Sequence, residues 1–222
     1  MNCLFENWRR YLNEQAKEQT YQIYCDMDGV LVDFETAAIQ QINQDLGDKT
    51  ILGKKLNKLR QKLSELGRDF ITIKDLHKMD KENRLQAARN YMYSRFENDE
   101  EFWANLPWMP GGKELWNYLS KFNPNILTAP MQGQGSKSGK QRWIENNLSP
   151  APKDIFMSHE KYNWATDESG NPNVLIDDFI TNTIPWEEAG GQAILHTSVN
   201  DTVQKLKSLI NNVPAEEEGD LL

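Results

Sequence analysis

The stretch Tyr21 to Phe34, which reads YQIYCDMDGVLVDF, holds two closely spaced carboxylates that could take part in a reaction. Its apolar, β-prone start leads straight into two carboxylates, Asp26 and Asp28, and Gly29 follows at once. This order predicts a strand with both carboxylates at its carboxyl end, where open α/β sheets build their sites. Two acids so close together repel each other and are hard to desolvate unless a cation lies between them. Asp26 and Asp28 therefore indicate a metal-assisted reaction.

Two simpler interpretations of this stretch compete with a reactive site. A calcium-binding loop would need a glutamate at its twelfth position, but Ala37 stands there, so that interpretation fails. A turn without function is the second, since Asp and Gly are ordinary turn residues. The rest of the chain counts against the turn, because polar residues also follow later predicted strands.

Two of those later strands carry the argument further. The run Asn125–Thr128 closes with a hydroxyl, and the run Asn173–Ile176 leads into a second acid pair, Asp177 and Asp178. Acids with a purely structural role rarely recur in this way at two strand ends of one sheet. We expect these side chains to meet Asp26 at the carboxyl edge of a parallel sheet.

The chain is organised as strands alternating with helices, interrupted by a purely helical block. Helices are predicted within residues 1–20 and over 35–46, 54–66, 73–76, 81–96, 109–122, 138–147 and 199–210, and further strands over 155–157 and 193–195. This alternation predicts an α/β fold, a Rossmann-like parallel sheet covered on both faces. A helical cap would be inserted after the first strand and would sit over the strand ends as a lid.

The expected division follows from this pattern. Residues 1–34 and 105–214 would form the α/β core, and 35–104 the helical cap. Residues 215–222 would be an acidic tail that we expect to be disordered.

Composition limits the classes of function. Of the 222 residues, 38% are hydrophobic and 26% charged, as in a soluble globular protein. The net charge of −8 argues against binding extended nucleic acid, which needs a basic surface. No apolar run approaches the roughly 20 residues of a membrane span, and the start of the chain lacks a secretory signal. Cys3 and Cys25 are too few for a disulfide framework, so we expect a cytoplasmic protein without membrane contact.

Other catalytic schemes fit the sequence less well. The glycine-rich segment GQGSKSGK (133–140) lacks the glycine spacing and the Ser or Thr of a phosphate-binding loop. We therefore expect a flexible loop there, bordering the site. His77, His159 and His196 are scattered and form no zinc motif, and no Gly-x-Ser-x-Gly elbow is present.

The strand followed by DMDGV (26–30) resembles the opening motif of the haloacid-dehalogenase-like (HAD) phosphohydrolase superfamily. Similarity to its 5′(3′)-deoxyribonucleotidase branch extends over DMDGVLVDFE (26–35), FWANLPWMPGG (102–112), KQRWIENNL (140–148), VLIDD (174–178) and WEEAGGQAILHT (186–197). The resemblance covers most of the chain outside the helical block and the first twenty residues. It implies a HAD-like core, Mg²⁺ as cofactor and a small phosphoester, expected to be a nucleotide, as substrate.

The resemblance also implies roles for the polar residues. Asp26 would attack phosphorus and form an aspartyl-phosphate, while Asp28 would protonate the leaving oxygen and then activate water. Thr128 would bind the phosphate through its hydroxyl and Ala129 through its backbone N–H. The residues implied at the magnesium site are Asp26, Asp28 through its carbonyl, Asp178, and Asp177, which would hold a water beside the metal or orient a lysine.

Some assignments stay open at this stage. The lysine that neutralises the phosphate is Lys161 or Lys140; we favour Lys161, which follows the strand 155–157, as in the family, although most lysines lie on the surface. Phe34 would line a nucleoside pocket or belong to the core. Phe102 and Trp103 are expected to be core at the base of the cap.

The leading prediction is therefore a 5′-nucleotidase-type hydrolase that releases phosphate from (deoxy)nucleoside monophosphates. One alternative is a phosphatase or phosphotransferase that acts on a sugar phosphate or a nucleic-acid 3′ end. A binding module without catalysis is another. The sequence leaves a homodimer open, and it leaves the base and sugar preference open as well.

Overall fold

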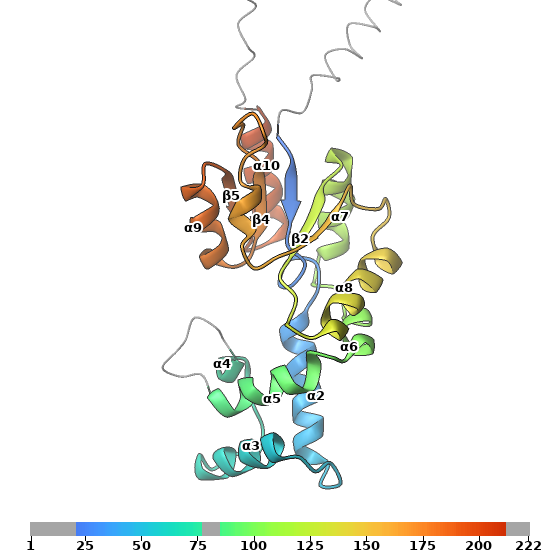
Figure 1. Ribbon diagram of the computed structural model, residues 1–222, viewed down its shortest axis with the longest axis vertical. Coiled ribbons are helices and arrows are strands. Elements are labelled where there is room, and N and C mark those ends of the chain that lie inside the picture. Colours follow the sequence, from blue (N-terminus) through green and yellow to red (C-terminus); the bar gives the residue numbers. More distant parts are fainter. Residues whose placement is uncertain (1–20, 77–84, 212–222) are drawn as a thin grey trace, which may run out of the picture.

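The computed structural model describes residues 21–76 and 85–211, and its centre is a five-stranded sheet (Figure 1). The strands are β1 (Ile23–Cys25), β2 (Asn125–Thr128), β3 (Ile155–Met157), β4 (Val174–Asp177) and β5 (Gln192–Leu195). Their order in the sheet is β3-β2-β1-β4-β5, and every neighbouring pair is parallel. The chain therefore reverses its direction of winding between β1 and β4, and sheets of this kind bind ligands at that point.

The three central strands β1, β2 and β4 are buried on both faces of the sheet, to which their side chains point alternately. Ile23 and Cys25 belong to a core cluster that also holds buried residues of α7, α8 and α10. Tyr24 belongs to a second cluster with Trp186 of α9. The helices and 3₁₀ turns around the sheet are α7 (Gly112–Leu119), η1 (Ser120–Phe122), α8 (Gln134–Asn147), η2 (Lys161–Trp164), α9 (Ile180–Glu188) and α10 (Val199–Asn211). The predicted α/β class is confirmed.

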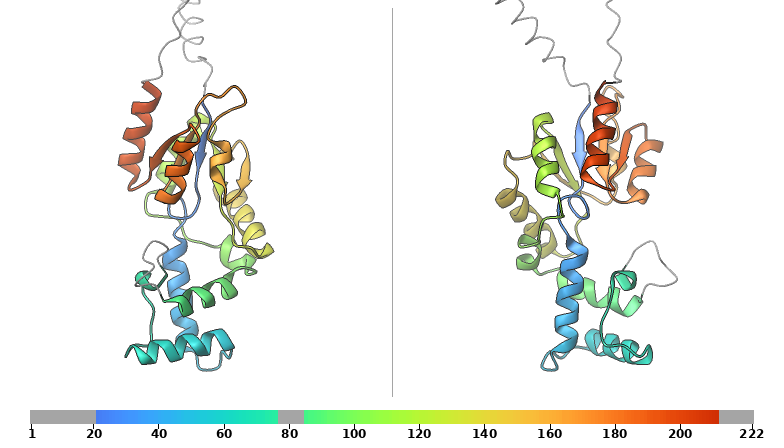
Figure 2. Two further views of the ribbon diagram at one scale, coloured as in Figure 1. Left: turned by 60° about the vertical axis from the view of Figure 1, so that its left-hand side comes forward. Right: turned by 180° about the vertical axis from the view of Figure 1, so that it is seen from behind.

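Between β1 and α7 the described residues form helices and no strand. They are α2 (Phe34–Gly47), α3 (Lys54–Glu65), α4 (Ile73–Leu76), α5 (Gln86–Phe96) and α6 (Glu100–Ala104). Helix α2 begins where Asp33 accepts a hydrogen bond from the Thr36 backbone N–H, which is the usual capping of a helix start. Figures 1 and 2 show α2 leading away from the carboxyl edge of the sheet, with α5 beside it and α3 at its far end.

The chain leaves and re-enters the sheet region through two connectors that are hydrogen-bonded to each other. The Asp33 N–H donates to the Pro107 carbonyl at 2.9 Å, and the Met109 N–H donates to the Leu31 carbonyl at 2.8 Å. The helical segment is thus tied back at its base. Its status as a separate domain stays a prediction.

One local prediction was wrong, and one helix was missed. The segment GQGSKSGK is not a loop, because α8 starts at Gln134 and includes nearly all of it. Helix α9 was not predicted, and Pro185 lies inside it. The predicted N-terminal helix, the acidic tail and the start of the predicted helix 81–96 lie outside the described residues. No helix in the described part of the chain is long and apolar enough to cross a membrane.

Candidate active site

The loop after β1 presents the first two carboxylates. The backbone N–H groups of Leu31 and Val32 both donate to the Met27 carbonyl at 2.9 Å, which closes a tight loop around Asp28. Gly29 has φ +77°, and a Cβ at this position would lie 2.1 Å from Asp178 Oδ2. Only glycine fits both the backbone conformation and the approach of that carboxylate. This is the physical reason for the glycine in the Asp-x-Asp-Gly pattern.

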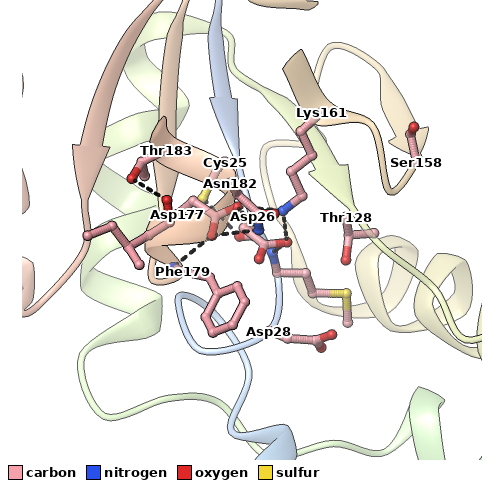
Figure 3. A network of polar contacts seen from close by, with 12 residues as sticks. Cys25, Asp26, Asp28, Thr128, Ser158, Lys161, Asp177, Phe179, Asn182 and Thr183 are labelled. Atoms are coloured by element: carbon pink, nitrogen blue, oxygen red, sulfur yellow. Dashed lines mark hydrogen bonds and ion pairs between the residues drawn. The ribbon is translucent and has the colours of Figure 1, made fainter. Parts of the chain in front are cut away.

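One half of the site is built around Lys161, and its residues come from the core region. The Lys161 ammonium lies 2.9 Å from Asp26 Oδ1 and 2.6 Å from Asp177 Oδ2 (Figure 3). Burial alone would lower the pKa of Lys161, but the carboxylates of Asp26 and Asp177 raise it above its ordinary value. Lys161 is therefore a fixed positive charge beside Asp26.

Asp177 is held in place by more than this lysine. Its carboxylate accepts hydrogen bonds from Asn182 Nδ2 at 3.0 Å and from the Phe179 backbone N–H at 2.8 Å (Figure 3). Burial and the charge of Asp26 raise its pKa, while Lys161 and Asn182 oppose that rise. Of the two roles considered for Asp177, orienting the lysine is the one that these contacts support. We call Asp26, Lys161, Asp177 and Asn182 the Lys161 cluster.

The second half of the site is built around Lys140, and both candidate lysines thus reach the site. Lys140 comes from α8 and is fully buried. Its ammonium donates to Asp28 Oδ2 at 2.6 Å and to the Thr128 hydroxyl at 2.9 Å. The other oxygen, Asp28 Oδ1, is buried and has no hydrogen-bond partner among the residues that the structure describes. We call Asp28, Thr128, Lys140 and the overlying Trp103 the Lys140 cluster.

Asp178 lies directly after β4, and its carboxylate is close to those of Asp26 and Asp177. One oxygen from each of the three lies within 4.8 Å of the others. Loss of hydration, followed by the charges of Asp26, Asp177 and Asp28, raises the pKa of Asp178 to about 7. Such crowding of carboxylates is relieved by a cation.

The donor set fits a divalent cation. With all groups ionised, the carboxylates of Asp26, Asp28, Asp177 and Asp178 outweigh the two lysines by two charges, which one such cation would balance. Mg²⁺ takes oxygen ligands of this kind and keeps several waters. The Asp178 carboxylate also lies directly against the backbone of the Asp28 loop, because Gly29 has no side chain to keep it away.

The remaining predicted residues lie near this edge with less definite contacts. Ala129 follows Thr128 directly and is half-buried. The Phe34 ring stacks on Trp103 at 4.8 Å with an interplanar angle of 3°, so one of its faces is covered. Trp103 is 2% exposed and belongs to the core, as expected. Phe102 is partly buried and packs against the same core.

Sequence reasoning missed Asn182 and the ring of Phe179. Figure 3 shows the Phe179 side chain beside the carboxylates, on the side of Asp28. Phe179 directly precedes α9 and Asn182 lies in the first turn of that helix, which the sequence pattern did not reveal. An amide four residues after an acid pair was the only available signal.

The comparisons with known proteins add a resemblance of fold. No protein-family model matches the chain, and no curated protein sequence matches it. Among solved structures, the HAD-hydrolase YfnB from Bacillus subtilis, bound to magnesium, aligns with a TM-score of 0.49 at 13% identity, over 87% of this chain and 100% of that one. A HAD family hydrolase from Deinococcus radiodurans with bound phosphate and sodium aligns with a TM-score of 0.48 at 14% identity, over 89% and 100%. These values are too low to carry an argument about activity, so the function rests on the site itself.

Proposed function

We propose that this protein is a magnesium-dependent phosphomonoester hydrolase that works through an aspartyl-phosphate on Asp26. The observation that carries the proposal is the pairing of two buried lysines with two different carboxylates, Lys161 with Asp26 and Lys140 with Asp28. Two fixed cations beside two carboxylates suit an anionic substrate that must approach an anionic nucleophile. A binding module would not need a carboxylate with an unpartnered buried oxygen beside the nucleophile.

In the first step, one bond to phosphorus forms and another breaks. Asp26 attacks phosphorus, a bond forms between its carboxylate oxygen and phosphorus, and the ester bond to the leaving oxygen breaks. For this step Asp28 enters the reaction protonated on Oδ1, and it gives that proton to the leaving oxygen and becomes a carboxylate. Asp28 is suited to this role because Lys140 holds Oδ2 in place while Oδ1 stays without a partner.

The second step returns the site to its starting state. Asp28 takes a proton from a water that attacks phosphorus, the bond from phosphorus to Asp26 breaks, and phosphate leaves. Lys161 and the Thr128 hydroxyl stabilise negative charge at the transferring group. Mg²⁺ would be held by Asp26, Asp178 and the Asp28 carbonyl, and when bound it supplies positive charge for the phosphate oxygens.

For the substrate we favour (deoxy)nucleoside monophosphates, on the resemblance of five segments to the 5′(3′)-deoxyribonucleotidases. Phe34 stands next to the Asp-x-Asp loop, where an aromatic ring could stack on a base. Since Trp103 covers one face of Phe34, a base could stack only on the other. This covered face favours a second candidate, a phosphatase for sugar phosphates or similar esters.

Phosphate release from a panel of nucleoside 5′- and 3′-monophosphates and sugar phosphates, with Mg²⁺ and with a chelator, tests the proposal. We expect metal-dependent turnover that Asp26→Asn removes. Asp33→Asn is the matched control, because the Asp33 side chain caps α2 by accepting a hydrogen bond from the Thr36 backbone N–H at 3.1 Å. Turnover of sugar phosphates alone would replace the nucleotide by the second candidate. No turnover of any phosphoester, or full activity of Asp26→Asn, would overturn the proposal.

A further inference from the structure

The glycines of GQGSKSGK have a structural role that the proposed chemistry does not explain. A Cβ at Gly133 would lie 2.1 Å from the Glu97 carbonyl oxygen, and one at Gly135 would lie 2.3 Å from the Asn98 carbonyl carbon. A Cβ at Gly139 would lie 2.5 Å from both the Glu100 carbonyl oxygen and Trp103 Cβ. Because these glycines have no side chain, the backbone of α6 and of the turn before it can lie directly against α8 and its first residue.

Polar contacts also fix the position of α6 along α8; we call the contact between these two helices, with the turn before α6, the seam. The Ser138 hydroxyl donates to Glu100 Oε2 at 2.7 Å, and Arg142 reaches Glu100 Oε1 at 3.0 Å. The Ser136 backbone N–H donates to the Glu97 carbonyl at 3.1 Å. The helical segment is therefore seated on α8 in a defined position.

The consequence of this seating is that Trp103 covers Lys140. The centroid of the Trp103 ring lies 5.0 Å from the Lys140 ammonium, within the range of a cation–π contact. The indole itself is fixed, because its Nε1–H donates to the Phe96 carbonyl at 2.7 Å and Phe34 stacks on it. Gly139, which precedes Lys140 directly, is the position where the seam is tightest against Trp103 Cβ.

Lys140 needs such support. A lysine chain is flexible and its ammonium has three rotatable donors, so its position depends on what surrounds it. Here Asp28 takes one donor and Thr128 another, while the Trp103 ring face lies against the same ammonium. The two polar contacts come from the sheet region, and the ring comes from the helical segment.

We propose that Trp103 is a positioning residue for Lys140, and that Gly139 is the small residue that allows it. Seating of α6 on α8 places the indole face against the ammonium and holds it between Asp28 and Thr128. The effect on catalysis rests on the proposed function, whereas the placement of the ammonium does not. Trp103 thereby makes the Lys140 cluster depend on the position of the helical segment.

Two substitutions of Trp103 test this in the full chain, Trp103→Leu, which removes the aromatic face, and Trp103→Phe, which keeps one. Reductive methylation of lysines followed by peptide mass spectrometry measures access to Lys140 without any substrate. We expect Lys140 to react about tenfold faster in Trp103→Leu than in the wild type, and Trp103→Phe to stay close to the wild type. Lys161 serves as the internal control, since its contacts lie outside the seam.

Kinetics give the second readout. We expect kcat of Trp103→Leu to fall about tenfold with a smaller change in KM, and Trp103→Phe to restore most of it. Gly139→Ala should behave like Trp103→Leu, whereas Gly47→Ala is the matched control because its Cβ would meet nothing within 4 Å. Should Gly139→Ala fail to fold, the Trp103 pair decides alone.

The outcomes separate this inference from the proposed function. Equal rates of Lys140 methylation in Trp103→Leu and in the wild type would overturn the positioning role, even if the enzyme turns over phosphoesters. Loss of protection in Trp103→Leu but not in Trp103→Phe would support it, even if no phosphoester is hydrolysed. Equal loss in both variants would mean that Trp103 only fills space, and would overturn it.

Discussion

The two halves of the site differ in what holds them together. The Lys161 cluster is built from the carboxyl ends of the strands β1 and β4 and from η2 and α9, which lie beside the sheet. The Lys140 cluster instead combines the β1 loop, β2 and α8 with Trp103 from the helical segment. Asp26, the proposed nucleophile, thus belongs to the half whose contacts all come from the core region. Asp28, the proposed proton donor, belongs to the half that Trp103 of the helical segment completes, so a change in that segment should affect Asp28 before Asp26.

The largest expected difference between the two halves is in kcat, when Asp26 or Asp28 is replaced by asparagine. Asp26→Asn should lower kcat on the order of a thousandfold or more for every substrate, because no other carboxylate replaces the nucleophile. Asp28→Asn should lower kcat about a hundredfold for an alkyl phosphate and less for an aryl phosphate, whose leaving oxygen needs no proton. Steady-state kinetics on a matched pair of substrates checks this. Equal sensitivity of both variants to the leaving group would contradict the division of roles.

The two lysines should differ in their effect on stability. Lys161→Met leaves the buried carboxylates of Asp26 and Asp177 without their cation, and should lower the free energy of unfolding by about 3 kcal/mol. Lys140→Met leaves Asp28, whose side chain is 29% exposed, and should cost less than half as much. Urea unfolding in the presence of a chelator measures both. A larger loss for Lys140→Met would reverse the comparison.

The stability of the protein should depend on pH through Asp178, which directly follows β4. The pKa of Asp178 lies near 7 in the folded protein, above its unfolded value, so the folded state keeps a proton that the unfolded state loses between these values. Stability of the metal-free protein should therefore fall as pH rises toward about 7, and Mg²⁺ should raise Tm more at about pH 8 than at about pH 5.5.

Thermal unfolding at both pH values, with Mg²⁺ and with a chelator, provides the measurement. Asp178→Asn is the control, because it removes the titrating carboxyl and should flatten the pH dependence. An unchanged pH profile in this variant would show that Asp178 is not the titrating group.

The smallest expected effect comes from Asn182. Asn182→Ala removes the amide that donates to both oxygens of Asp177, and should lower the free energy of unfolding by about 1 kcal/mol. It should leave methylation of Lys140 unchanged, because Lys140 belongs to the other half. Asn105→Ala, on an exposed position, is the control. Exposure of Lys140 in Asn182→Ala would show that the two halves are coupled.

Much of the core could be predicted from the sequence because its signals are local. Each strand is a short apolar run, and the acids of β1 and β4 follow those runs directly, so parallel pairing brings them together. The predicted β2 and β3 agree with the structure residue for residue. Helix α9 was missed because Pro185 breaks the usual helical signal.

The rest of the site depends on contacts between distant segments, which no local pattern shows. The sequence treated Lys161 and Lys140 as alternatives and favoured Lys161, whereas both reach the site, one from a 3₁₀ turn and the other from a helix. The glycines of α8 suggested flexibility when read alone. Their neighbours in α6 and in the turn before it lie more than 30 residues earlier in the chain, so their packing role was visible only in three dimensions.

The most direct test of the central claim is to look for phosphate on Asp26. A rapid acid quench of the enzyme with radiolabelled substrate and Mg²⁺, followed by peptide mapping, would locate any covalent phosphoryl group. We expect label on the peptide that contains Asp26, at the β-carboxylate of that residue, and none in Asp26→Asn. Label on Asp28 or another residue, or steady turnover in Asp26→Asn, would contradict it.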